Sequence, residues 1–380
     1  MDHSHMADDC GCIFYSAMVY FESMEEKTYF LLSFLHKNDI ISKKGKQEKR
    51  WRQSMISIRE VARLAGVSAA TVSRVMNGTA KVDPEKKERV LRVIEETGFV
   101  PNEVARTLFR KSAKTIGLIV PSIHNPYFTE LAAHIDTISL QCGFRPFLCN
   151  TGYDPEKEKA AVQMLVSMNA DAIIVASCSD QLQETLNNCP IPVVALDAML
   201  YGTDVEACIY CDYYEGGRMA TEYLIERGCQ SIVCIKGPQY RYSARARYQG
   251  YLDVCRERNL LEQTVECDYD FNQGLAMTEE LLQKYPDVDG IVACNDIVAI
   301  STYKVLHKRN IPVPEKIQLI GFDDISFATL LSPELTTIRQ PVKEMVEKAI
   351  KLIANQELSE MSSAKFVFSV SLIPRQTTKN

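Results

Sequence analysis

The sequence predicts an α/β protein, in which an N-terminal all-α helix-turn-helix domain precedes a core of two doubly wound parallel-sheet lobes. Before Lys114, apolar residues recur every three or four positions, as they do on one face of a helix. After Lys114, short apolar runs alternate with helical stretches, which is typical of strands buried on both faces of a parallel sheet. Six such runs indicate two lobes. They are residues 116–120, 172–176, 193–196, 232–235, 291–293 and 317–320.

The composition is that of a soluble globular chain with more than one domain. Its 380 residues are 46% hydrophobic and 24% charged, enough to bury a sizeable core. The 13 cysteines are scattered without zinc-ligand spacing, so we expect reduced thiols, no metal and no cofactor. No signal peptide is evident, and the apolar run 13–21 is too short to span a bilayer. We therefore expect a cytoplasmic protein that does not bind a membrane.

The net charge of −6 is unevenly distributed along the chain. Residues 56–114 contain 12 Lys and Arg against 7 Asp and Glu, a net of +5. Residues 115–380 contain 23 against 34, a net of −11. A basic segment joined to an acidic one indicates that only the smaller part meets a polyanion, and the alternative is a solvated charged face.

The basic segment contains three predicted helices. Residues 58–65 carry one apolar stripe, and Gly66 ends it. Ser68 is a good N-cap for a second short helix, and Asp83, a cap followed by proline, begins a third that ends at Gly98. Two short helices joined by a tight turn, with a third closing the core, form a helix-turn-helix unit.

This pattern divides the chain into four segments. Residues 1–54 do not resemble a folded domain, and we expect a disordered extension; the alternative is a basic arm that binds phosphates. Residues 55–100 form the predicted helix-turn-helix domain, 101–114 a hinge helix and linker, and 115–380 a bilobal effector-binding and dimerisation core.

The second helix of a helix-turn-helix unit enters the major groove of DNA. The residues predicted to meet base edges are Ala69, Ala70, Ser73, Arg74 and Asn77. Arg74 can donate two hydrogen bonds to guanine, and the alternative is a solvated surface arginine. Ser57, Ser68 and Thr71 can bind phosphates and fix the register.

The short segment 101–108 is predicted to contact DNA as well. Leu108 is a candidate wedge for a minor-groove step, which would kink the duplex. Ala105 is a candidate contact to the same residue of a partner chain, and Asn102 completes the set of predicted DNA contacts. The alternative is a plain linker.

Several motifs, in order, resemble those of the LacI/GalR family of bacterial transcriptional regulators. The run IREVARLAGVSAATVSRVMNG (58–78) is similar to that family's DNA-binding signature, and PNEVARTL (101–108) to its hinge helix. The similarity continues through KTIGLIVP (114–121), ND (295–296), GFDD (321–324) and LTTIRQP (335–341). The resemblance implies a repressor that binds a pseudo-palindromic double-stranded DNA operator as a homodimer. It also implies a core shaped like the periplasmic sugar-binding proteins.

Polar residues follow the apolar runs of the core, where ligands bind at the carboxyl ends of parallel strands. Tyr127 and Phe128 can stack on a sugar ring, and Asn125 can bond its hydroxyl groups. Asp197 and Asp323 each follow a run, and each carboxylate can receive two hydroxyl groups. The alternative for the two aromatic residues is a place in the hydrophobic core.

The resemblance to ribose-type regulators and their periplasmic relatives extends the candidate effector site to nine residues. They are Asn125, Tyr127, Phe128, Asp197, Arg247, Phe271, Asn295, Asp323 and Gln340. Such a set fits a small neutral polyhydroxylated effector, a sugar, better than a phosphate. Ala198 departs from the ribose-type pattern, where a larger polar or aromatic residue often stands, and this counts against both a ribose and a purine assignment. A nucleoside or purine is the alternative effector. Asp212 is expected to brace the cleft.

Two other classes of protein are weighed against a regulator. A periplasmic sugar-binding protein would share the core but has no use for residues 56–110. A nucleotide-dependent enzyme needs a glycine-rich phosphate loop, and neither GxGxxG nor a P-loop pattern occurs. His124, His134 and His307 form no catalytic constellation, so no catalytic residue is expected. We expect the effector to close the lobes and change the spacing of the hinges, with induction preferred over corepression.

Overall fold

The computed structural model describes residues 56–77, 82–99, 112–176, 180–200, 203, 205–361 and 363–379. They form two units, a head that ends at Phe99 and a core that begins at Ser112. The predicted extension 1–54 and most of the predicted hinge, with Asn102, Ala105 and Leu108, lie outside the described residues.

The head consists of three helices: α3 (Ile58–Ala65), α4 (Ala69–Asn77) and α5 (Pro84–Thr97). One fully buried valine from each helix, Val61, Val72 and Val90, forms the centre of its small core. The Ser57 side chain caps α3 by accepting from the backbone N–H of Glu60 at 3.2 Å. The turn between α3 and α4 needs the left-handed φ of +64° at Gly66, which explains a glycine there.

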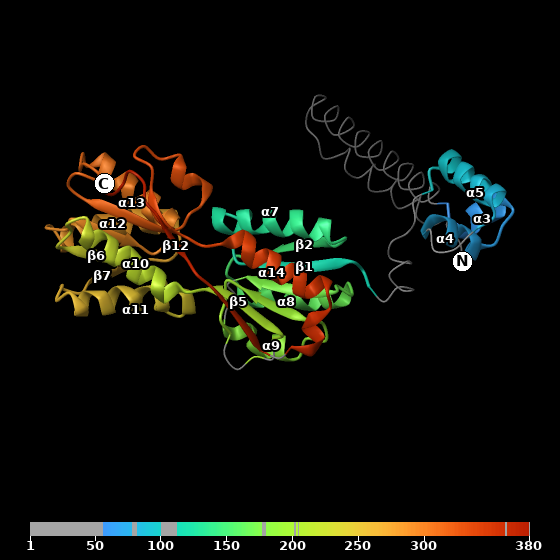
Figure 1. Ribbon diagram of the computed structural model, residues 1–380, viewed down its shortest axis with the longest axis horizontal. Coiled ribbons are helices and arrows are strands. Elements are labelled where there is room, and N and C mark those ends of the chain that lie inside the picture. The colour runs from blue at the N-terminus through green and yellow to red at the C-terminus, as the bar shows by residue number, and fades with distance from the viewer. Residues whose placement is uncertain are drawn as a thin grey trace, which may run out of the picture. The chain divides into compact units, whose positions relative to one another are not determined.

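The first lobe of the core contains a six-stranded sheet in which every described strand pair is parallel (Figure 1). In spatial order its strands are β11 (Ala364–Phe368), β5 (Ala207–Cys211), β4 (Val193–Leu196), β3 (Ala172–Ala176), β1 (Thr115–Val120) and β2 (Arg145–Asn150). The helices of this lobe are α7 (Pro126–Gln141), α8 (Pro155–Ser167), α9 (Gln183–Asn187) and α14 (Val342–Ala354). Helices α7 and α14 pack together, as do α8 and α9.

The second lobe repeats this architecture with one antiparallel strand at the edge. In spatial order its strands are β12 (Ser371–Ile373), β10 (Thr336–Arg339), β9 (Gln318–Asp323), β8 (Gly290–Ala293), β6 (Ile232–Lys236) and β7 (Gln263–Glu266). Its helices form two pairs, α10 (Tyr213–Glu226) with α11 (Tyr242–Glu257) and α12 (Phe271–Lys284) with α13 (Asp296–Lys308). The predicted fold class is confirmed, and all six predicted runs are strands.

Gly217 and Gly250 allow α10 and α11 to approach closely. A Cβ atom at Gly217 would collide with the backbone of Arg247, and one at Gly250 with the backbone of Tyr214. These glycines therefore determine how deep Arg247, on α11, sits in the second lobe.

The chain crosses between the lobes three times: from β5 into α10, from β10 into α14, and from β11 into β12. Asp212 caps α10 at the first crossover, where its Oδ1 accepts from the N–H of Glu215 at 3.0 Å. Gln340 lies at the second crossover, directly after β10. The contacts of side chains at these positions therefore depend on how the two lobes are placed relative to each other. No helix among the described residues is long and apolar enough to cross a bilayer.

Candidate functional site

The head exposes only part of the predicted DNA-contacting set. Ala70 and Arg74 are exposed one turn apart on α4, while Ala69 packs against the small core. Arg74 makes no ion pair or hydrogen bond within the described part of the chain, whereas Arg63 on α3 is paired with Glu60 at 2.6 Å. Arg74 is therefore a charged group free to donate to a base edge.

The remaining predicted DNA contacts of the head already have local roles. Ser57 caps α3, and the Ser68 hydroxyl shares a hydrogen bond of 2.9 Å with the hydroxyl of Thr71. Ser73 is half-buried and has a partner within the protein. Asn77 ends α4, and its side chain lies outside the described part. A hydroxyl that caps a helix can still donate to a phosphate, since it uses its oxygen as acceptor.

The two strand-end carboxylates lie at equivalent places in the two lobes. Asp197 follows β4 and has a φ of +56°, and Asp323 ends β9 with a φ of +118°. Both are 7% exposed. Burial raises the pKa of Asp197 to about 6, against the opposing effect of the Tyr213 hydroxyl. Burial also raises the pKa of Asp323 to about 7, against the opposing charge of Arg247.

Arg247 is the cation of the site, and its guanidinium is held in place from several sides. Nη1 donates to the carbonyl oxygen of Cys294 at 2.8 Å, and Nη2 lies 3.4 Å from Oδ1 of Asp323. The guanidinium carbon is 3.6 Å from the ring centre of Phe322 and 5.3 Å from that of Tyr213. Nε is buried and has no hydrogen-bond partner among the described residues, so a donor remains available.

Gln340 connects the two lobes within the site. Its amide nitrogen donates to Oδ1 of Asp323 at 2.8 Å. The hydroxyl of Tyr127, from the first lobe, donates to its amide oxygen at 3.4 Å. Five predicted residues, Tyr127, Asp197, Arg247, Asp323 and Gln340, are thus brought together by hydrogen bonds or by mutual electrostatic influence.

The other four predicted residues are two asparagines that cap helices and two phenylalanines that contact aromatic or charged neighbours. Asn125 and Asn295 are helix caps, which accept from the N–H of Tyr127 and of Val298 at 3.1 and 3.0 Å. Phe128 is 5% exposed, with its ring 5.2 Å from that of Tyr127. Phe271 begins α12, and its described aromatic contact is with the ammonium group of Lys304, 5.3 Å away.

Sequence reasoning missed several residues around the site. Tyr213 is 1% exposed, and its hydroxyl donates to Oδ1 of Asp197 at 2.5 Å. Because β5 was not predicted as a strand, nothing indicated that Tyr213 begins a helix at a crossover. Asp296 is fully buried behind Asp323 and accepts from the hydroxyl of Thr337 at 2.6 Å, and burial holds its pKa well above the usual range.

Further contacts between the lobes involve residues outside the predicted set. The guanidinium of Arg241, before α11, lies 5.0 Å from the ring centre of Tyr153, in the loop after β2. The backbone N–H of Ser326 donates to the carboxylate of Glu130 on α7 at 2.8 Å. Through these contacts the two lobes touch each other beside the site. A void of about 10 Å³, the space of a single water, lies beside Arg247 within the second lobe.

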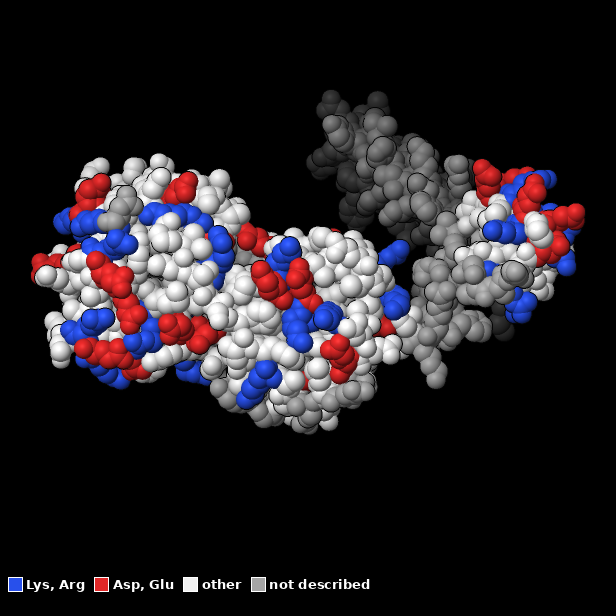
Figure 2. Space-filling model, viewed as in Figure 1, with Lys and Arg blue, Asp and Glu red and all other residues white. Residues whose placement is uncertain are grey.

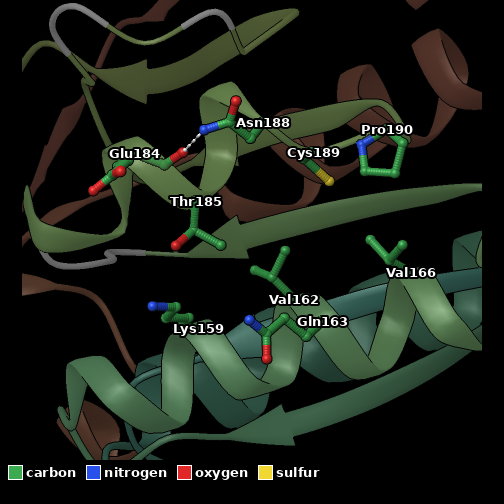
Figure 3. A pocket seen from close by; sticks show the side chains of 9 residues that line it. All are labelled: Lys159, Val162, Gln163, Val166, Glu184, Thr185, Asn188, Cys189 and Pro190. Atoms are coloured by element: carbon green, nitrogen blue, oxygen red, sulfur yellow. Dashed lines mark hydrogen bonds between the residues drawn. The ribbon is translucent and has the colours of Figure 1, made fainter.

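A larger cavity of about 410 Å³ lies elsewhere, between α8 and α9 of the first lobe (Figure 3). Its lining includes Val162 and Val166 on one side and Thr185 and Pro190 on the other, and it contains no predicted effector residue. Figure 2 shows charges of both signs along α10 and α11, where Arg218 pairs with Glu257 at 2.7 Å.

Comparisons with known proteins agree with this architecture. Residues 57–102 match the model of the bacterial regulatory proteins of the lacI family, and 113–370 that of the periplasmic binding proteins and sugar binding domain of the LacI family. The chain is 35% identical to the ribose operon repressor of Halalkalibacterium halodurans, over 86% of this chain and 98% of the relative. It is 32% identical to the HTH-type transcriptional repressor PurR of Pasteurella multocida, over 86% and 99%.

Solved structures give the same result. A periplasmic binding protein/LacI transcriptional regulator from Alkaliphilus metalliredigens, complexed with D-xylulofuranose, is 35% identical, with a TM-score of 0.63 over 70% of this chain and all of that one. The Lac repressor dimer bound to operator shares the fold, with 24% identity and a TM-score of 0.77 over 86% of this chain and all of that one. The chain belongs to the LacI family, and it is a DNA-binding regulator controlled by an effector rather than an enzyme.

Proposed function

We propose that a neutral sugar of pentose size is the effector, and that it binds between Asp197 of the first lobe and Asp323 of the second. The observation that carries this proposal is the meeting of both buried carboxylates with Arg247, Tyr127 and Gln340. Carboxylates and an amide accept and donate to hydroxyl groups, while the single guanidinium balances part of their charge. An anionic effector would meet two carboxylates and is disfavoured.

The relatives support a sugar and leave a purine as the second candidate. The names of the ribose operon repressors and of the D-xylulofuranose complex point to pentoses, and the PurR relatives point to purines. A purine needs an open aromatic face on which to stack. The Phe322 ring is covered by the Arg247 guanidinium, and Tyr213 is packed against Tyr210. Hydrogen bonding to a polyol therefore suits the site better than stacking of a base.

The operator-binding part of the proposal rests on the head. Arg74 on α4 is proposed to read bases in the major groove, with Ser57, Ser68 and Thr71 at phosphates. Residues 101–114, with Asn102, Ala105 and Leu108, are proposed to form the hinge between head and core. The regulator is proposed to work in the cytoplasm, where a bacterial operator is found.

The proposed mechanism is a shift between two placements of the lobes. Three crossovers link them, and Gln340 contacts both Tyr127 and Asp323, so a ligand at this point favours one placement. The placement sets the spacing of the two hinges in the homodimer, and thereby operator affinity. We propose that the sugar acts as an inducer.

Thermal unfolding of the full-length protein with pentoses, hexoses, nucleosides and free purines tests the effector. A pentose at 100 times its dissociation constant stabilises the folded protein by about 2.7 kcal/mol. The same pentose should release operator DNA in a fluorescence-anisotropy titration. If only a purine stabilises the protein, the effector is a purine and the sugar proposal is wrong. If a sugar stabilises the protein but tightens operator binding, the sugar is a corepressor.

A further inference from the structure

Tyr213 lies inside the proposed effector site, on one of its two carboxylates. It is the first residue of α10, directly after the chain leaves β5 of the first lobe. Its side chain is 1% exposed, and its hydroxyl donates to Oδ1 of Asp197 at 2.5 Å. It therefore uses an acceptor position that a hydroxyl group of the effector would otherwise take.

The Tyr213 ring is held by aromatic neighbours from two further elements. The ring of Tyr210, on β5, is stacked at 6.5 Å, and that of Tyr242, on α11, meets it edge-on at 6.1 Å. The Arg247 guanidinium lies 5.3 Å from its centre. Swinging the ring away would break the hydrogen bond and these contacts together, so Tyr213 is a fixed wall of the site.

The wall limits what Asp197 can bind. Each carboxylate oxygen accepts about two hydrogen bonds, and Tyr213 occupies one position on Oδ1. Ala198, which follows Asp197, adds only a methyl group, so the bulk at this end comes from α10. An effector with one more hydroxymethyl group at this end would meet a buried ring and find fewer free acceptors.

We propose that Tyr213 is a specificity-determining residue that limits the effector to a single pentose-sized ring at the Asp197 end of the site. This inference rests on the sugar effector proposed above and names the residue that sets its size. Its ring excludes an effector with an additional hydroxymethyl group, and its hydroxyl orients the Asp197 carboxylate.

The test compares two pairs of sugars that differ by one hydroxylated carbon: D-ribose with D-allose, and D-xylulose with D-fructose. Affinities are measured by calorimetry for the full-length wild type and for Tyr213→Leu, Tyr213→Met and Tyr213→Phe. Leucine and methionine keep an apolar side chain in the core, and the unfolding temperature without sugar verifies folding. Tyr214→Leu is the matched control, because Tyr214 is the next residue but is 37% exposed and bonds Asp253 instead.

We expect the wild type to prefer the pentose of one pair at least 30-fold, and Tyr213→Leu or Tyr213→Met to reduce this preference at least tenfold. Tyr213→Phe, which retains the ring, and Tyr214→Leu should keep the preference within threefold. A wild type without preference, or an unchanged preference in the folded Leu and Met variants, would overturn the role of Tyr213 and leave the sugar effector intact. Absence of binding by all four sugars to the wild type would instead overturn the pentose effector itself, and this inference with it.

Discussion

The two lobes present the same feature, a buried carboxylate at a strand end with positive φ, but they neutralise it differently. Asp323 lies beside Arg247 and accepts from Gln340, whereas Asp197 accepts from the uncharged hydroxyl of Tyr213. Asp323 has a cation in contact, whereas Asp197 forms no ion pair among the described residues, although the charges of Arg247 and Arg241 lower its pKa. Burial raises the pKa of both carboxyl groups, so ionisation costs free energy in each lobe. The difference teaches that in the second lobe the charge is shared with a buried arginine that depends on it, whereas in the first lobe an uncharged hydroxyl contacts the carboxylate.

Removing the cation should give the largest effect on stability. Arg247→Met leaves Asp323 buried without its ion partner, which typically costs about 3–5 kcal/mol. Since the folded-state pKa of Asp323 is already raised, the folded state binds the proton more tightly, and the loss should be larger at pH 8 than at pH 5. Urea unfolding at both pH values measures it.

Arg256→Met is the matched control for this experiment. Arg256 is on the same helix but is 59% exposed, and it pairs with Asp253 and Glu262. Exposed pairs contribute at most about 1 kcal/mol. Equal losses for Arg256→Met and Arg247→Met would contradict a special role for the buried pair.

The two carboxylates should respond to neutralisation to different extents. Folding raises the pKa of Asp197 from 3.8 to about 6, so the wild type takes up a proton on folding and loses stability as the pH rises from about 4 to 6. Asp197→Asn removes this cost, and the effector-free variant should be more stable by up to about 3 kcal/mol at pH 8, while effector affinity falls at least tenfold. Asp323→Asn also removes an ionisation cost, but it leaves Arg247 buried without its carboxylate, so its gain at pH 8 should be smaller than that of Asp197→Asn.

Unfolding in urea between pH 4 and 8, with and without the sugar, separates the two variants. The gain of Asp197→Asn should become small near pH 4 and vanish below it, where the wild-type carboxyl is protonated in both the folded and the unfolded state. Equal gains of stability in both variants at pH 8 would show that the two sites are neutralised in the same way.

Both carboxylates could be predicted from the sequence, and the family resemblance also gave Arg247 and Gln340, the partners of Asp323, but Tyr213, the partner of Asp197, could not be predicted. Asp197 and Asp323 follow apolar runs, and ligands gather at such strand ends, so a local pattern was sufficient. Tyr213 follows β5, which was not recognised among the buried strands, and its position depends on a crossover between lobes. The pairing of β11 with β5 joins segments about 150 residues apart in sequence, and no local period encodes it.

The head shows the same division between local and distant information. Its three helices, the caps at Ser68 and Asp83 and the end of the first helix at Gly66 were predicted, because each depends on neighbours a few residues away. Ala69, however, packs into the core rather than facing outward, because the orientation of α4 is determined by contacts with α3 and α5. Ala70 and Arg74 remain as the exposed part of the predicted base-reading face.

A substitution in the head serves as a reference for the substitutions in the two lobes, because it should alter operator affinity and leave the affinity for the sugar unchanged. Arg74→Ala should weaken binding to the specific operator by about 1–3 kcal/mol, roughly 5- to 150-fold, with a much smaller change on random DNA. Fluorescence anisotropy on both DNAs measures it, with Arg63→Ala, whose charge is paired with Glu60, as control. Equal losses on operator and random DNA would mean that Arg74 contacts phosphate only.

The smallest expected effect concerns a contact that joins the lobes away from the two carboxylates. Arg241 of the second lobe lies 5.0 Å from the ring centre of Tyr153 in the first, and 5.4 Å from that of Tyr240 in its own lobe. The two contacts are alike in geometry, but only the first depends on closure. Tyr153→Leu should therefore destabilise the closed placement by about 0.5–1 kcal/mol and weaken sugar binding roughly two- to fivefold, mainly through faster dissociation. Tyr240→Leu removes a cation–π contact that closure does not change, so its sugar affinity should equal that of the wild type. Stopped-flow dissociation of the sugar distinguishes them, and equal rates for the two variants would show that the Tyr153 contact does not hold the lobes together.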